Sequence, residues 1–176
     1  MADLKTLGAG KYLHLVANDR WEWARRPAEH DAACIIATDT HSALILVEQF
    51  RHPLGTNTIE LPAGLVGDEA GKQHEGILTA AARELREETG YESKDWRFLM
   101  RAASSAGLTS ETPAIVAARN CYKTGPGGGV DDENITVHVV ARDGAEAWIA
   151  EKTQNGCIFD ARVYVGLAVA RGLLSL

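Results

Sequence analysis

The sequence predicts an α/β or α+β protein, an α/β/α sandwich whose mixed sheet lies between helices, with small antiparallel strands at its N-terminal end. One long helical segment, residues 74–90, lies between segments that have the composition of strands. Two further helical segments close the chain. A sheet that is interrupted and followed by helices is normally covered by helices on both faces. The 176 residues, 45% of them hydrophobic, fit one globular domain with a small extension.

The first thirty residues contain two short segments in which apolar and polar side chains alternate. Residues 11–18 and 21–27 have this pattern and are joined by a turn-like stretch, so they predict an antiparallel pair of strands. We therefore divide the chain into an N-terminal β appendage, residues 1–30, and a main domain, residues 31–176. Such an appendage commonly serves dimerisation, so a homodimer is the expected assembly.

Apolar runs rich in β-branched residues predict the strands of the main sheet. The first two runs are separated by Thr-His-Ser, which predicts a hairpin, and the third is short and ends at Pro62. The predicted strands are residues 33–39, 43–51, 57–62, 96–104, 113–125 and 135–143. A glycine-rich, acidic stretch at 125–134 predicts a loop, and helices are predicted over 144–152 and 159–174.

The long helical segment has no proline and is rich in Ala, Leu, Glu and Arg, which are good helix formers. Gly90 stands where a C′ glycine would end the helix. At 100° per residue one apolar stripe forms along the segment. Its members are Ile77, Leu78, Ala81, Ala82 and Leu85.

Three glutamates crowd the end of this helix. Glu84 and Glu88 are four residues apart at the edge of the apolar stripe, and Glu87 lies further round, where it can pair with Arg83. Like charges at this spacing destabilise a helix by roughly 0.2–0.5 kcal/mol. Acids in the last turn also oppose the helix dipole, at roughly 0.3–1 kcal/mol each. A bound cation would compensate, and carboxylate oxygens suit Mg²⁺ or Mn²⁺, although a solvated acidic helix end is the alternative.

Composition excludes several function classes. The net charge of −6 and the lack of a basic block argue against nonspecific nucleic-acid binding. Three cysteines without CxxC spacing predict neither a zinc site nor a disulfide framework: Cys34, Cys121 and Cys157. No apolar run of 18 residues and no leader-like start are found, so we expect a cytoplasmic protein with no membrane segment.

The stretch Arg83–Tyr91 resembles the core of the Nudix box, which reads Arg-Glu, a hydrophobic residue, any residue, Glu-Glu, any residue, Gly and a hydrophobic residue. The chain is therefore identified as resembling the Nudix hydrolase superfamily. Glu75 also stands where the box has its first glutamate. The box glycine departs from the pattern, since Glu69 holds its usual place and Gly64 is the better match. The loop from Leu65 to His74 is consequently five residues longer than usual.

Segments outside the box resemble the ADP-ribose pyrophosphatase branch of that superfamily. They are residues 20–26, 47–64, 104–111 and 131–140. The resemblance implies Mg²⁺-dependent hydrolysis of the pyrophosphate link of a nucleoside diphosphate sugar, giving a nucleoside monophosphate and a sugar phosphate. Two alternatives are a Nudix hydrolase of dinucleoside polyphosphates or nucleoside triphosphates, and a sensor that binds a nucleotide sugar without cleaving it.

The resemblance also implies roles for the acidic residues. Glu84, Glu88 and the carbonyl of Ala63 match the metal ligands, with Mn²⁺ as an alternative ion. Glu87 matches a further ligand that takes part in catalysis, and Arg83 orients it. Glu133, in the glycine-rich loop, matches the general base. Asp131, Asp132 and Glu111 are the competing candidates, and a solvated turn is the structural alternative.

Substrate recognition is implied at four positions. Trp21 matches an aromatic residue that stacks on the nucleobase, and Trp23 shares its strand face. Arg26 and Arg51 match arginines that meet the diphosphate, for which a guanidinium is well suited. The lengthened loop, which begins at Leu65, is a candidate for contacts to the sugar. In this branch the N-terminal strands swap between protomers, so the base site would be shared across a homodimer.

Overall fold

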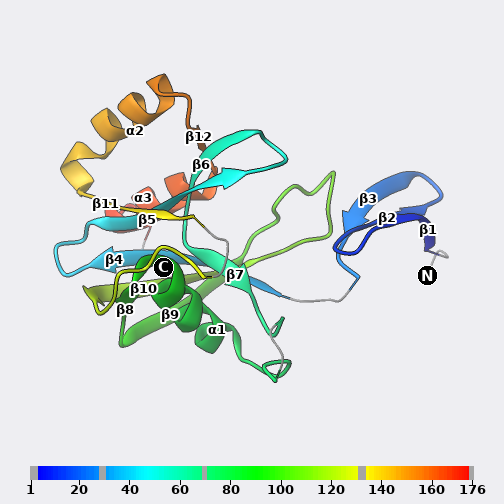
Figure 1. The fold of residues 1–176 in the computed structure, drawn as a ribbon, viewed down its shortest axis with the longest axis horizontal. Helices are drawn as coiled ribbons and strands as arrows, with labels where there is room; N and C mark the ends of the chain where they lie inside the picture. The colour runs from blue at the N-terminus through cyan, green and yellow to red at the C-terminus, as the bar shows by residue number, and fades with distance from the viewer. Residues whose placement is uncertain (1–3, 28–30, 69–70, 131–133, 175–176) are drawn as a thin grey trace.

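The computed structural model describes residues 4–27, 31–68, 71–130 and 134–174. The N-terminal appendage is a separate antiparallel sheet in the order β1-β2-β3, at one end of the molecule (Figure 1). Its strands are β1 (Lys5–Ala9), β2 (His14–Asn18) and β3 (Trp21–Arg25). The two predicted strands are confirmed as β2 and β3. The sequence analysis missed β1, whose five residues are all exposed and which bulges between Thr6 and Gly8.

The main domain is built on one nine-stranded mixed sheet. Its strands are β4 (Ala32–Asp39), β5 (Leu44–Arg51), β6 (Thr56–Glu60), β7 (Ala63–Leu65), β8 (Tyr91–Glu92), β9 (Asp95–Arg101), β10 (Ala114–Lys123), β11 (Thr136–Val140) and β12 (Ile158–Phe159). β10 runs parallel to β4, and β12 runs parallel to β6, whereas the other pairings are antiparallel. The predicted mixed sheet is confirmed, and the short strands β7, β8 and β12 add to its edges.

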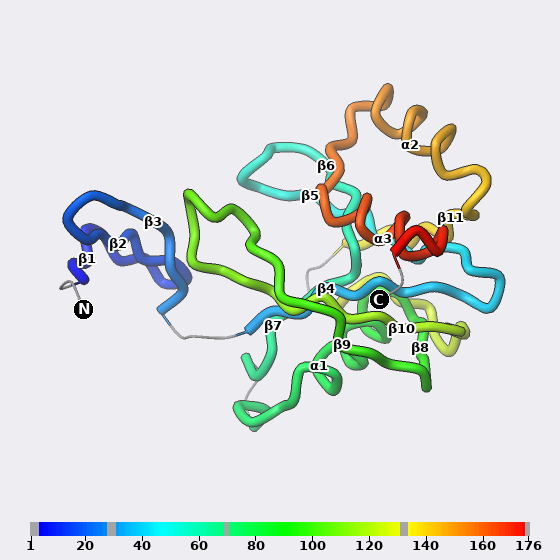
Figure 2. Tube along the Cα trace, turned by 180° about the vertical axis from the view of Figure 1, so that it is seen from behind, coloured from blue at the N-terminus to red at the C-terminus, as the bar shows by residue number. Residues whose placement is uncertain are grey.

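Helices cover both faces of this sheet, as predicted. They are α1 (Ile77–Glu84), its π-helical continuation η1 (Leu85–Thr89), the short 3-10 turn η2 (Arg142–Gly144), α2 (Ala145–Gln154) and α3 (Arg162–Ala170). Figures 1 and 2 show α1 on one side of the sheet and α2 with α3 on the other. No helix among the described residues is long and apolar enough to span a membrane.

The central strand β4 supplies both cores because its side chains alternate between the faces. Ala33, Ile35 and Ala37 pack with Ala81 and Leu85 on the α1 side. On the other side, Cys34 and Ile36 of β4 pack in one core with Val163 and Leu167 of α3. The two buried layers fix the sheet between the helices.

The apolar stripe predicted for the long helix needs one correction. Ile77, Ala81 and Leu85 face the sheet, at successive four-residue steps. Leu78 is 38% exposed, so it lies outside the buried stripe. Ala80 is buried instead, next to the buried Ala81, and these small side chains let the helix pack close to the sheet.

A long loop of the main domain contacts the appendage. The segment between β9 and β10 reaches β3, as Figure 2 shows in green. The amide of Ala24 donates to the carbonyl of Leu108 at 2.8 Å, and the amide of Ser110 donates to the carbonyl of Ala24 at 3.3 Å. The appendage is therefore held against this loop by main-chain hydrogen bonds.

Candidate active site

The acidic helix end has an unusual backbone. The α-helix stops at Glu84, and the next five residues form a π-helical turn, which commonly occurs at functional sites. Gly90 ends the turn with φ of 68°, as the C′ position requires. A Cβ at residue 90 would lie 2.2 Å from the carbonyl oxygen of Gly125, so glycine is needed there twice over. This turn, rather than a regular α-helix, sets the positions of Glu87 and Glu88.

The carboxylates of Glu84 and Glu88 lie against the main chain of β7. Glu88 is only 4% exposed, and its Oε2 accepts a hydrogen bond from the amide of Ala63 at 3.0 Å. Glu84 sits over Gly64, where an added Cβ would come within 2.0 Å of the carboxylate. Burial raises the pKa of Glu84, although neighbouring Arg83 opposes this. The glycine thus makes room for a semi-buried acid that benefits from a nearby positive charge.

Arg83 holds several groups of this site at once. Its Nη1 donates to Glu84 at 2.8 Å and to Glu87 at 3.2 Å. Its Nη2 donates to Glu75 and to the carbonyl of Leu65, both at 3.2 Å. The predicted pairing with Glu87 is confirmed, and Glu75 forms an ion pair with the same arginine. Leu65 is likewise tied to the arginine by its main chain.

The donor set suits a divalent cation with oxygen ligands. Glu84 and Glu88 provide two carboxylates beside the main chain of Ala63. Across the described ranges no group of three or more His, Cys, Asp or Glu side chains forms a complete metal cage. Mg²⁺ is usually bound by one or two carboxylates, with waters and substrate phosphates completing its shell. Two carboxylates beside a main-chain segment are compatible with this mode of Mg²⁺ binding.

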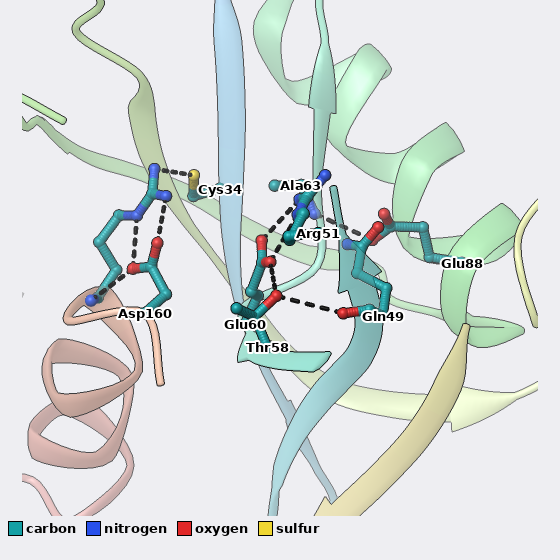
Figure 3. A network of polar contacts seen from close by, with 9 residues as sticks. Cys34, Gln49, Arg51, Thr58, Glu60, Ala63, Glu88 and Asp160 are labelled. Carbon is teal, nitrogen blue, oxygen red and sulfur yellow. Dashed lines mark hydrogen bonds and ion pairs between the residues drawn. The ribbon is translucent and has the colours of Figure 1, made fainter. Parts of the chain in front are cut away.

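Arg51 is held rigidly at the edge of this site. Its Nε and Nη2 each donate to one oxygen of Glu60 at 2.7 Å, which is a bidentate pair. Thr58 donates to the same carboxylate at 2.5 Å. Figure 3 shows Arg51 beside Ala63, with Glu60 on one side and Glu88 on the other. The hydrogen bonds to Glu60 and, less strongly, the charge of Glu88 raise the pKa of Arg51.

The two remaining predicted substrate residues, Arg26 and Trp21, differ in whether they line a further cavity. Arg26 donates to Glu111 at 3.2 Å and lines a cavity of about 660 Å³ between the appendage and the loop after β9. Trp23 and Leu108 also line that cavity. Trp21 is 64% exposed and is not among the residues that line this cavity. Glu133, Asp131 and Asp132 lie outside the described residues.

Sequence reasoning missed four polar residues near Arg51. They are Thr58, Glu60, Asp160 and Arg162. The signal for Glu60 was a charged residue at the end of an apolar strand, where a buried acid must have a partner. Asp160 and Arg162 are distant in sequence from their neighbours in the fold, and no local pattern singles them out.

The sequence and the fold of this chain resemble those of known proteins. The model of the NUDIX domain matches residues 28–143. A methanol dehydrogenase activator of Bacillus methanolicus is 31% identical over 137 residues, which is 77% of this chain and 69% of the relative. An ADP-ribose pyrophosphatase of Mycobacterium tuberculosis is 36% identical over 102 residues, or 57% of this chain and 47% of the relative.

Two further similar proteins are a second pyrophosphatase and a hydrolase of known structure. An ADP-sugar pyrophosphatase of Mus musculus is 36% identical over 96 residues, covering 52% of this chain and 42% of the relative. This chain thus spans less than half the length of either pyrophosphatase. The crystal structure of an ADP compounds hydrolase has a TM-score of 0.74 at 20% identity, covering 98% of this chain and 91% of that one, which shows a shared fold.

Proposed function

This chain belongs to the NUDIX domain family, and on that premise we propose that it is a Mg²⁺-dependent hydrolase of nucleoside diphosphate sugars of the ADP-ribose type. Water cleaves the P–O–P link and releases a nucleoside monophosphate and a sugar phosphate. The observation that carries the proposal is the pair of carboxylates, Glu84 and Glu88, set against the main chain at Ala63 and Gly64. The names of the pyrophosphatase relatives support the substrate class.

Glu84, Glu88 and the carbonyl of Ala63 would hold the metal, with Glu87 as a further ligand. When bound there, Mg²⁺, or Mn²⁺ in its place, would supply positive charge to the phosphate oxygens and would make a water molecule more acidic. Arg83 keeps the glutamates in place, because its guanidinium contacts both Glu84 and Glu87.

Arg51 and Arg26 bind the diphosphate in this proposal. Arg51 is already oriented by Glu60, so little side-chain freedom is lost when phosphate binds. Glu133 is proposed as the general base. Replacing Glu133 by Gln should lower kcat by about 100-fold or more with little change in KM, since general acid–base catalysis contributes typically 10²–10⁴-fold. If Glu133→Gln leaves kcat unchanged, Asp131 and Asp132 become the candidates for the general base. Asp131→Asn and Asp132→Asn test them in the same way.

The N-terminal appendage, residues 1–30, is proposed to form a homodimer and to present Trp21 to the nucleobase. Several of its apolar side chains are more than 40% exposed, which is costly for an isolated sheet. They include Leu4, Leu7, Tyr12, Leu13, Leu15 and Trp21. Sedimentation velocity of the full chain should give a dimer, and Leu13→Glu together with Leu15→Glu should give a monomer. A monomeric wild type contradicts the proposal. The cytoplasmic location stays a prediction from composition.

The proposed function is tested by phosphate release in the presence of a phosphatase. The panel holds nucleoside diphosphate sugars, dinucleoside polyphosphates and nucleoside triphosphates, each with Mg²⁺ and with EDTA. We expect metal-dependent cleavage of the diphosphate sugars, which also identifies the preferred sugar. Cleavage of triphosphates alone would refute the substrate class, and tight nucleotide binding without any cleavage would indicate a sensor.

A further inference from the structure

A second cavity of about 410 Å³ is lined by Arg51. The end of the β5–β6 hairpin, β12 and the start of α3 form its walls. Charged side chains line it, among them Arg51, Glu60, Asp160 and Arg162, together with the apolar side chains of Leu54 and Phe159. With Arg26 at its rim, the lining carries three arginines and two acids, so its formal charge is positive.

Arg162 is built into this cavity by three contacts. Its Nε and Nη2 donate to the two oxygens of Asp160 at 2.8 and 2.5 Å, and its Nη1 donates to the sulfur of Cys34 at 3.2 Å. Asp160 also accepts from the main-chain amide of Arg162 at 2.7 Å. Asp160 raises the pKa of Arg162, so the guanidinium stays charged. A guanidinium has five N–H groups. The contacts of Arg162 with the side chains of Asp160 and Cys34 use three of them, so among the described residues two N–H groups are left to donate to a ligand.

This cavity adjoins the carboxylates of the proposed metal site through Arg51. The same arginine lines the cavity and lies within electrostatic reach of Glu88. In the view of Figure 3, Arg51 and Glu60 lie between Glu88 and Asp160. A group held by the metal and by Arg51 can therefore extend toward Arg162.

The chemistry of the lining selects which half of a nucleotide sugar would fit. Nucleobases stack on aromatic rings, and the one aromatic ring among the described lining residues, Phe159, already packs edge-on against Trp148. Trp23 instead lines the other cavity, and Arg26 lines both, so the two cavities meet at that guanidinium. Phosphate suits the forked guanidinium of Arg162, and the carboxylates of Glu60 and Asp160 can accept hydrogen bonds from sugar hydroxyls.

We propose that this cavity binds the sugar-phosphate half of the substrate, and that Arg162 contacts its phosphate and so helps to determine specificity. The proposal rests on the proposed function, since it places the second half of a nucleoside diphosphate sugar. It gives the substrate an orientation, with the base toward the appendage and the sugar phosphate toward the start of α3.

The test measures binding of product halves by isothermal titration calorimetry in Mg²⁺, so it needs no turnover. The probes are ribose 5-phosphate, glucose 1-phosphate, inorganic phosphate and AMP. The variant Arg162→Gln removes the charge. The double variant Asp160→Asn/Arg162→Gln also removes the charge of Asp160, so no carboxylate is left unpaired. It provides the test if the single variant does not fold. The control Arg97→Gln removes an exposed arginine that lines a separate cavity.

The expected result is a loss of about 10- to 100-fold in affinity for ribose 5-phosphate in both variants, the size of a lost charge-assisted hydrogen bond. The affinity for AMP should stay within about twofold, and Arg97→Gln should match the wild type. Equal losses for AMP and ribose 5-phosphate, unchanged sugar-phosphate binding, or a wild type that binds no sugar phosphate would each overturn the proposal. Tighter binding of one sugar phosphate over inorganic phosphate would support sugar recognition; equal binding would refute it.

This test separates the inference from the proposed function. A protein that binds ribose 5-phosphate through Arg162 but cleaves no nucleoside diphosphate sugar refutes the proposed function alone. A protein that cleaves ADP-ribose with the same KM before and after Arg162→Gln refutes only the placement of the sugar phosphate.

Discussion

Gly64→Ala tests whether the position of the Glu84 carboxylate matters for activity. The added Cβ would lie 2.0 Å from the carboxyl carbon and from Oε1 of Glu84, whereas ordinary contacts begin at 3.4 Å. The carboxylate must therefore move by about 1.4 Å, the difference between 3.4 and 2.0 Å. A misplacement of about 1 Å at a catalytic group can cost about 100-fold in rate. We expect kcat/KM for ADP-ribose to fall by about 100-fold or more.

The fold should survive this change. The clash involves the free end of a flexible side chain, which can rotate away, and residue 64 lies in a strand, where Ala is better tolerated than Gly. The free energy of unfolding should change by about 1 kcal/mol or less in chemical denaturation. Gly144→Ala is the control, because nothing lies within 4 Å of its added Cβ. Full activity in a folded Gly64→Ala protein would refute the role given to Glu84.

Three further predictions follow from the contacts described. Glu88→Gln keeps an acceptor for the Ala63 amide but removes the charge, so kcat should fall by about 100-fold or more with little change in unfolding midpoint; normal turnover would contradict this. Glu60→Gln weakens the bidentate pair that orients Arg51, so KM for ADP-ribose should rise by about tenfold with a smaller change in kcat; an unchanged KM would count against the orienting role. Glu48→Gln should cost about 1–2 kcal/mol of unfolding free energy at pH 7, an amount reduced for solvent screening. In urea titrations the wild-type advantage should shrink below pH 4.5 and be mostly lost near pH 2; a difference that keeps its full size at pH 2 would contradict this.

The sign of the last prediction follows from the pKa of Glu48. Burial opposes ionisation, but hydrogen bonds led by that of Lys152 outweigh it and lower the pKa from 4.5 to about 2. The charged form is therefore favoured by folding. Its contribution is complete above the unfolded value of 4.5 and is lost as pH falls through the folded value of about 2.

Local patterns predicted most of the fold and the acidic centre of the site. Strand β4 follows from its apolar run rich in β-branched residues. The helix that ends at Gly90 follows from side-chain periodicity and from the conformational freedom of glycine. The pairing of Arg83 with Glu87 follows from helical spacing. These features depend on residues close together in sequence, so one sequence suffices to see them.

Features that depend on distant residues could not be predicted in this way. The π-helical turn ends at Gly90, where the chain passes close to Gly125, a residue distant in sequence. Arg162 contacts Cys34 across 128 residues, and its role in a cavity depends on the whole sheet. The exposed Leu78 was misplaced because periodicity describes a stripe but not how the helix rotates against its neighbour.

Direct binding of Mn²⁺, followed by the EPR signal of the free ion, tests the central claim that the acidic helix end holds a divalent cation. Glu84→Gln with Glu88→Gln removes two negative charges at the site, and Glu146→Gln with Glu151→Gln removes the same charge from exposed positions of α2. We predict that the wild type and the α2 variant bind Mn²⁺ in competition with Mg²⁺, and that the site variant binds about 100-fold more weakly. Equal Mn²⁺ affinity in all three proteins, or no binding by the wild type, would contradict the claim.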